Sequence, residues 1–267
     1  MTQPDKRRKL AQDIANGVAG WYQLQLSQGF GDFFGEDSAQ LTILQILSAQ
    51  TNFEVKPSQA LAGHEDDQLR LDIALGAWGE KRTSYGAVEI KWLGSSNKAS
   101  TAARGSILAD ALRLSVVEST NIKANFLVVG GLEEKFSGIF GDNTREIAKT
   151  EGSRALFVKL FTRTVDTKGI AERKEIVAHF PNFIEKLPKL ARLREQDKLQ
   201  VTLLASAKVA QHDNLKAGIV YVWLCLKGAG RKQKRVVTDP ENSATSCSAT
   251  DASASAKPSL RSAGSAP

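Results

Sequence analysis

Charged residues interrupt two of the most apolar runs of the chain, at about residues 68–76 and 85–93. Asp72 stands within the first run, RLDIAL, and Glu89 and Lys91 stand within the second, AVEIKW. Strands disfavour these residue types, and a buried charge without a partner is costly. The fold of this segment must therefore either expose the three side chains to water or provide partners for their charges.

The two runs predict a pair of strands joined by a glycine-containing turn. Side chains alternate across a strand, so Glu89 and Lys91 are expected to project from one face of the second strand. A hairpin would then bring Asp72 beside both of them. In the first strand the face opposite to Asp72 is expected to carry the apolar residues Leu69, Leu71, Ile73 and Leu75.

Two carboxylates and an ammonium group that converge in this way favour metal-assisted chemistry. Neighbouring carboxylates repel one another unless a cation lies between them, and carboxylate oxygens suit Mg²⁺ or Mn²⁺. Mg²⁺ uses only one or two protein carboxylates and leaves positions for water and a phosphate oxygen. Lys91 would orient the attacking water or neutralise the charge that develops on a phosphate.

The Glu-x-Lys tripeptide is weak evidence when taken alone. It also occurs at 54–56, 133–135 and 172–174. The alternative interpretation is a half-exposed hairpin whose charges form an ordinary cross-strand ion pair. What distinguishes Glu89 and Lys91 is their context, an apolar strand that follows a second apolar strand carrying Asp72.

The rest of the chain predicts an α/β domain at about 1–230, with a mixed sheet covered by helices on both sides. A first helix at 4–27 is expected to bury Leu10, Ile14, Val18, Trp21 and Leu24. A second helix, with a start signal at Asp37, runs to about residue 50. Further helices are predicted at 105–119, in part of 133–150, and at 171–195 with breaks at Pro181 and Pro188. Further strands are predicted at 52–56 (closed by Pro57), 121–131, 154–163, 198–209 and 217–227.

Composition narrows the classes of function. The net charge of +7 fits a polyanionic partner such as nucleic acid. Two cysteines, Cys225 and Cys247, form neither a disulfide framework nor a zinc-binding spacing, which favours a reducing compartment. No apolar run approaches the roughly 18 residues of a membrane span, so a cytoplasmic protein without a membrane partner is expected. Residues 231–267 form a basic, Ser/Ala-rich tail that is expected to be disordered.

The segment RLDIAL…AVEIKW resembles the signature of the PD-(D/E)XK nuclease superfamily, which includes restriction endonucleases and many repair and phage-defence nucleases. There an Asp lies on one strand of a hairpin and an acidic-x-Lys on the next, and Asp72, Glu89 and Lys91 match these positions. Leu71 stands where the superfamily name places a proline. In that superfamily the core is a helix, three strands, a helix and a further strand, which fits the order of elements at about 30–165.

This resemblance implies a restriction endonuclease-like fold, here with an extra C-terminal strand pair, and a nuclease that uses Mg²⁺ or Mn²⁺ on nucleic acid, with DNA favoured. Asp72 and Glu89 would hold the metal, with the carbonyl of Ile90 as a third protein ligand. Lys91 would position water and stabilise charge. A homodimer would be needed to cut both strands of a palindrome symmetrically.

A glutamate on the first core helix often completes such a site, and Glu36 is the matching residue. Acidic residues near a helix N-terminus are also favoured by the helix dipole, which is an alternative reason for Glu36. Gln50 or Glu54 would take its place in a different alignment.

Two other interpretations stay open. The same fold would serve as a non-catalytic nucleic-acid-binding or interaction module, or the motif would be a chance match in an unrelated α/β protein, with Asp72 and Glu89 far apart. In the helix after the motif, Asp110 and Arg113 would brace the site or form a surface ion pair. Lys98 and Arg104 would contact DNA that approaches the site.

Overall fold

The computed structural model describes residues 2–50, 54–60, 70–77, 83–94, 100–117, 123–140, 152–180, 197–209 and 217–228. All of them belong to one compact unit, Met1–Arg231. The predicted tail at 231–267 lies outside the described residues. Among these residues no helix has the length and apolar character needed to cross a membrane.

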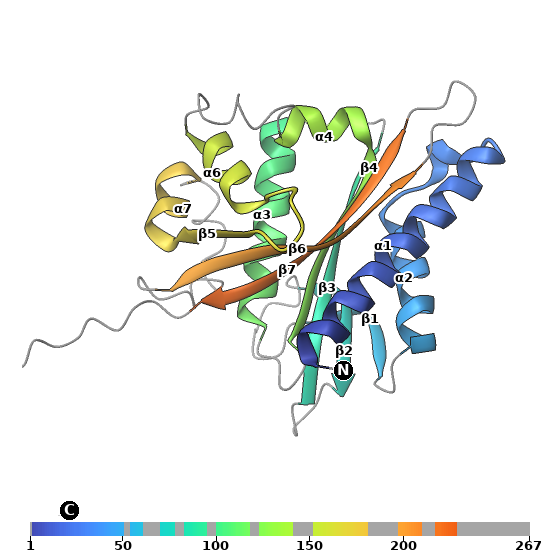
Figure 1. Cartoon of the computed structure of the whole chain (residues 1–267), viewed down its shortest axis with the longest axis horizontal. Helices are drawn as coiled ribbons and strands as arrows, with labels where there is room; N and C mark the ends of the chain where they lie inside the picture. The colour runs from blue at the N-terminus through green and yellow to red at the C-terminus, as the bar shows by residue number, and fades with distance from the viewer. Residues whose placement is uncertain are drawn as a thin grey trace, which may run out of the picture. The chain divides into compact units, whose positions relative to one another are not determined.

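One seven-stranded mixed sheet forms the centre of the molecule, which confirms the predicted α/β class (Figure 1). The strand order is β1-β2-β3-β4-β7-β6-β5, and among these neighbours only β3 and β4 are parallel. The predicted C-terminal pair is present, and it continues the central sheet because β7 pairs directly with β4. The strands are β1 (Val55–Ala60), β2 (Arg70–Ala77), β3 (Thr83–Leu93), β4 (Ala124–Leu132), β5 (Lys168–Glu172), β6 (Lys198–Val209) and β7 (Gly218–Gly228).

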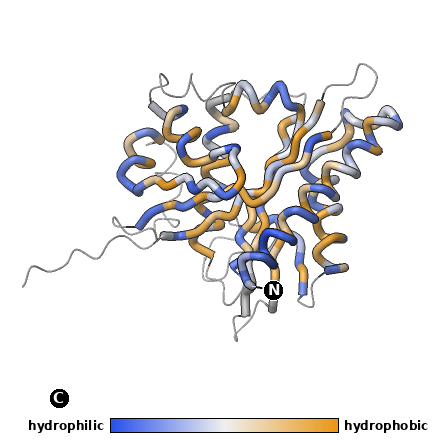
Figure 2. Tube along the Cα trace, in the orientation of Figure 1, coloured by the Kyte–Doolittle hydropathy of each residue, from blue (hydrophilic) through white to orange (hydrophobic). Residues whose placement is uncertain are grey.

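Helices cover both faces of this sheet, and each face has its own hydrophobic cluster. One cluster joins the sheet to α1 (Gln3–Ser27) and α2 (Glu36–Gln50), which are linked through the short 3-10 helix η1 (Gly31–Phe33). The other joins it to helices from the second half of the chain. Figure 2 shows the central strands as largely hydrophobic, whereas the helices alternate between hydrophilic and hydrophobic residues. The helices of the second face are α3 (Ser100–Val116), α4 (Glu133–Phe140), α6 (Ser153–Leu160) and α7 (Arg173–His179).

Helix α1 has the predicted bounds but not the whole predicted buried face. Val18 is buried as expected, and the buried stripe continues through Tyr22 and Leu26. Trp21 and Leu24 are 45% and 41% exposed. After Val18 the buried positions recur every four residues, so the steps of three that led to Trp21 and Leu24 select the wrong side of the helix.

The prediction of a strand at 154–163 is wrong, because this segment forms helix α6. Its buried residues are Leu156, Phe157, Val158 and Leu160, so nearly every position of the run is buried and the pattern fits a helix as well as a strand. The ring of Phe157 packs against that of Phe140 in α4, with 5.1 Å between centroids. An apolar run of this length does not by itself distinguish a buried strand from a buried helix.

Two further boundaries differ from the prediction. Strand β1 continues through Pro57 to Ala60, and Pro57 is tolerated there because β1 is the edge of the sheet. The segment that begins at 171 is not helical at once: strand β5 pairs with β6 up to Glu172, and α7 follows at Arg173. The predicted breaks at Pro181 and Pro188 lie outside the described residues.

Candidate active site

Strands β2 and β3 stop pairing where the charged residues begin. Their antiparallel register pairs Ile73 with Val88 and continues from there toward the turn. Strand β3 stays paired with β4 as far as Leu93. Leu71 packs in the cluster on the α3 face, whereas Ile73 packs in the cluster on the α1 face. The expectation that Leu71 and Ile73 share a face is therefore wrong, because β2 changes its orientation at Asp72.

Asp72 replaces the missing backbone pairing with bonds of its own. The backbone N–H of Ile90 donates to Asp72 Oδ2 over 2.7 Å. The side-chain amide of Gln40, on α2, donates to the carbonyl oxygen of Asp72 over 2.6 Å. Asp72 is thereby held between β3 and α2, at the point where the two strands separate.

Glu89 projects from β3 toward α3 and is almost completely buried, at 1% exposure. Its partner is the guanidinium of Arg113, whose Nε lies 3.1 Å from Oε1 and whose Nη2 lies 3.2 Å from Oε2. Both carboxylate oxygens of Glu89 thus contact one cation, which compensates the charge that the sequence places inside an apolar strand.

Asp110 links this pair to Lys91. It is also 1% exposed, and one of its oxygens contacts Arg113 on the next turn of α3. Its other oxygen lies 3.3 Å from Lys91 Nζ. Of the two alternatives for Asp110 and Arg113, the structure favours bracing of the site over a surface ion pair, because Asp110 is buried and contacts Lys91 while Arg113 contacts Glu89. Both side chains belong to the candidate site.

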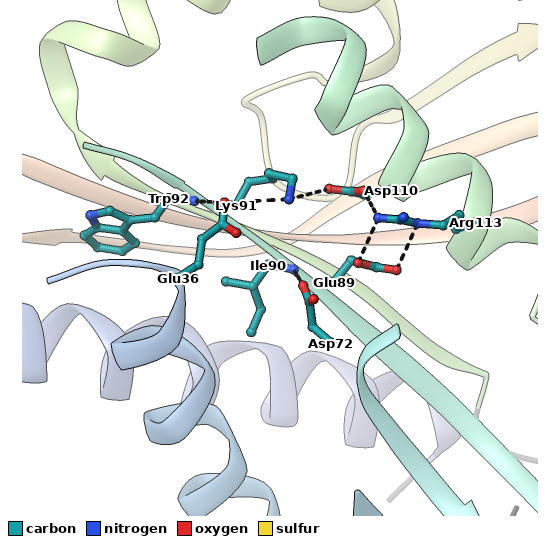
Figure 3. A network of polar contacts seen from close by, with 8 residues as sticks. All are labelled: Glu36, Asp72, Glu89, Ile90, Lys91, Trp92, Asp110 and Arg113. Carbon is teal, nitrogen blue, oxygen red and sulfur yellow. Dashed lines mark hydrogen bonds and ion pairs between the residues drawn. The ribbon is translucent and has the colours of Figure 1, made fainter. Parts of the chain in front are cut away.

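Glu36, the first residue of α2, contacts Lys91 from the helix layer on the opposite face of the sheet from α3. Its Oε1 lies 3.6 Å from Lys91 Nζ and accepts a 3.4 Å hydrogen bond from the backbone N–H of Trp92. The resulting network alternates in charge along its length, as Figure 3 shows. Its members are Glu36, Lys91, Asp110, Arg113 and Glu89.

An aromatic group fixes the start of α2 beside β3. The ring of Trp92 packs against Tyr22 of α1 and Phe34, with centroids 4.9 and 4.6 Å apart. The Trp92 ring occupies the space where a side chain on Gly130 of β4 would lie, so the glycine makes room for the ring. The packing of the Trp92 ring therefore fixes the backbone N–H that donates to Glu36.

Burial dominates the electrostatics of the site. It raises the pKa of Glu89 well above the ordinary 4.5, and the charge of Asp110 raises it further, against the opposing effect of Arg113. Burial likewise raises the pKa of Asp110 to about 6, although Arg113 and Lys91 oppose the change. Burial lowers the pKa of Lys91, but Asp110 and the other nearby carboxylates outweigh this and give a net increase. The charged carboxylates are therefore incompletely compensated by the cations of the protein.

We expect this imbalance to appear in the pH dependence of stability. Because the folded-state pKa of Asp110 lies above its ordinary 3.8, its contribution to stability is complete below about pH 3.8 and is lost as the pH rises through about 6. A shift of this size corresponds to about 3 kcal/mol at most. Urea unfolding between pH 4 and 8 should show that Asp110→Asn removes much of this loss. An unchanged pH profile in a folded Asp110→Asn protein would contradict the assignment.

The donor set fits a hard divalent cation in its chemistry and charge. Asp72 and Glu89 offer carboxylate oxygens, and the buried Oε1 of Glu89 makes no hydrogen bond, although it lies 3.1 Å from Arg113 Nε. Within the described residues no cluster of three His, Cys, Asp or Glu side chains is arranged to hold a metal ion. Mg²⁺ does not need such a cluster, since it commonly takes one or two carboxylates and keeps several waters.

The structure brings the five predicted site residues together: Glu36, Asp72, Glu89, Ile90 and Lys91. The two alternatives for Glu36 lie elsewhere: Gln50 is at the opposite end of α2, and the carboxylate of Glu54 pairs with Lys56. Asp72 Oδ2 accepts a hydrogen bond from the backbone N–H of Ile90, the residue that follows Glu89, so the structure places the two halves of the motif side by side.

Arg104 is not a surface contact for DNA, since it is buried and donates to the carbonyl oxygen of Ile139. Lys98 lies outside the described residues. Asp110 had a signal in the sequence, because it stands three residues after Ile107 and four before Leu114, on the buried side of α3.

No protein-family model, curated protein or solved structure matches this chain.

Proposed function

We propose that this protein is a divalent-metal-dependent nuclease that hydrolyses the phosphodiester bonds of nucleic acid, with DNA favoured. One observation carries the proposal: Asp72, Glu89 and Lys91 meet where β2 and β3 separate, and Glu36 of α2 approaches the same point. Carboxylate oxygens beside an ammonium group suit the binding of a hard cation and an anionic substrate.

The order of elements supports the same proposal. Helix α2, strands β1 to β3, helix α3 and strand β4 follow one another along the chain, and β3 runs parallel to β4. This is the order that the resemblance to PD-(D/E)XK nucleases implies. The restriction endonuclease-like fold is thus part of the proposal.

Each residue has a distinct role in it. Asp72 and Glu89 would hold Mg²⁺ or Mn²⁺, with the Ile90 carbonyl and Glu36 as further ligands, and the ion would act as a Lewis acid on the phosphate. Lys91 orients a water molecule for attack on phosphorus and stabilises the negative charge that develops as the P–O bond to the leaving oxygen breaks. The positive net charge of the chain favours the approach of a polyanion.

A second candidate is a nucleic-acid-binding module without catalysis. The observation that favours it is the contact of both Glu89 oxygens with Arg113, which leaves this carboxylate already paired. Under this alternative the protein would bind nucleic acid but would not cleave it in the presence of any divalent metal ion.

The test is a cleavage assay on supercoiled plasmid, linear duplex and labelled single strands of DNA and RNA, in Mg²⁺, Mn²⁺ or EDTA. We expect cleavage in one of the metals, none in EDTA, and a loss of about 10²-fold or more in Asp72→Asn, which keeps the shape of the side chain but not its charge. Asp166→Asn is the matched control, because Asp166 is half exposed and pairs with Arg8 outside the site.

Two results would contradict the proposal. Cleavage that survives in EDTA would exclude metal dependence, and Asp72→Asn with the activity of the Asp166→Asn control would exclude the site. Binding of the same substrates without cleavage in any metal would favour the second candidate.

A further inference from the structure

We infer that Arg113 is a built-in cation that limits the proposed metal site to one divalent ion. The inference rests on the proposed function, and it concerns a residue to which the resemblance gives no role. It also distinguishes between the one-ion and two-ion forms of phosphodiester hydrolysis.

The first argument is geometric. Two nitrogens of the Arg113 guanidinium each face one oxygen of Glu89, at 3.1 and 3.2 Å, and Nη2 also contacts Asp110. A carboxylate bridges two metal ions by giving one oxygen to each. Each oxygen of Glu89 keeps a lone pair that can bind an ion, but an ion on either oxygen would lie beside the positive guanidinium, so Arg113 opposes the binding of two ions by this carboxylate.

The second argument is the balance of charge. The network and Asp72 together hold four carboxylates and two side-chain cations, Lys91 and Arg113. Their formal charges leave two negative charges, which one divalent ion neutralises. A second ion would leave an excess of positive charge until the substrate arrives.

The third argument is that Arg113 is held in place. Its neighbours Leu112 and Leu114 are buried in the cluster beneath α3. The end of this helix is fixed to β4, because the side-chain amide of Asn125 donates to the carbonyl oxygens of Leu114 (2.8 Å) and Val117 (3.4 Å). These contacts anchor the backbone of α3 around Arg113.

Isothermal titration calorimetry of the whole chain with Mn²⁺, which measures the number of bound ions and their affinity, tests the inference. Wild type is expected to bind one ion. Arg113→Met is expected either to bind that ion at least about tenfold more tightly or to admit a second one, because a nearby positive charge is lost. Arg113→Lys should keep one ion, and Arg8→Met, at an exposed ion pair, should behave as wild type. A merely structural role for Arg113 would weaken Mn²⁺ binding instead.

The outcomes separate this inference from the proposed function. A wild-type protein that cleaves nucleic acid and binds two ions overturns the inference alone, as does a folded Arg113→Met protein that still binds a single Mn²⁺ ion with unchanged or weaker affinity. A wild type that binds no Mn²⁺ and cleaves nothing overturns both. If Arg113→Met does not fold, the number of Mn²⁺ ions located by anomalous scattering in wild-type crystals decides between one ion and two.

Discussion

Lys91→Met is expected to slow metal-dependent cleavage by about 10²–10³-fold, with the fold and nucleic-acid binding retained. Methionine keeps the apolar part of the side chain but removes the ammonium group that lies between Asp110 and Glu36. This group is one of two side-chain cations in the described site, and the Lys91 side chain is 22% exposed. Single-turnover cleavage rates and a filter-binding assay in Ca²⁺ measure the two effects separately.

The chain offers a matched control for this variant. Lys56 belongs to another Glu-x-Lys tripeptide, where it forms a 2.9 Å ion pair with Glu54 on the edge strand β1. Lys56→Met should cleave at the wild-type rate. If Lys91→Met and Lys56→Met differ by less than about threefold, Lys91 has no part in the chemistry.

Arg113→Met is expected to destabilise the fold by about 3 kcal/mol, the lower end of the range for breaking a buried ion pair. The cost arises because Glu89, at 1% exposure, is left without its cation, while Arg113 itself is 21% exposed at its side chain. Urea unfolding at pH 7 measures the free energy of unfolding.

A double-mutant cycle shows whether the pair is the cause. Glu89→Gln removes the charge that Arg113 compensates, so Glu89→Gln/Arg113→Met should recover a large part of the loss seen in Arg113→Met. Additive losses in the two single variants would mean that the residues act independently. Lys159→Met serves as a control, because its ion pair with Glu175 is exposed on the Lys159 side and exposed pairs contribute little.

The parts of the fold that sequence patterns predicted are those with strong local signals. Strands β6 and β7 are long apolar runs bounded by polar segments, and α1 has a helical repeat, so their bounds were close to correct. Helix α6 was mistaken for a strand because a short apolar run has no clear period. Strand β5 was missed because Gly169 and Ala171, which face inward, are too small to give a hydrophobic signal. Strand β5 forms because it pairs with β6, not because its own residues have a strong strand preference.

The residues of the candidate site also differ in how strong a local sequence signal they give. Asp72, Glu89 and Lys91 were found because charges in apolar strands are conspicuous. Asp110 and Arg113 give a weak signal, because an acidic and a basic residue three apart on a helix usually lie at the surface. Only the packing of α3 against β3 shows that they compensate the charges of the strand, and such a contact between distant segments has no local pattern.

The hydrogen bond from the Ile90 amide to the Asp72 carboxylate makes this amide a natural spectroscopic reporter. Most amides in a strand donate to a backbone carbonyl, for which a cation bound at the carboxylates does not compete. The Ile90 amide donates instead to a group that the proposed ion would share. Its resonance in a nitrogen-15 correlation spectrum would therefore follow cation binding without a label at the site, a substrate or any turnover.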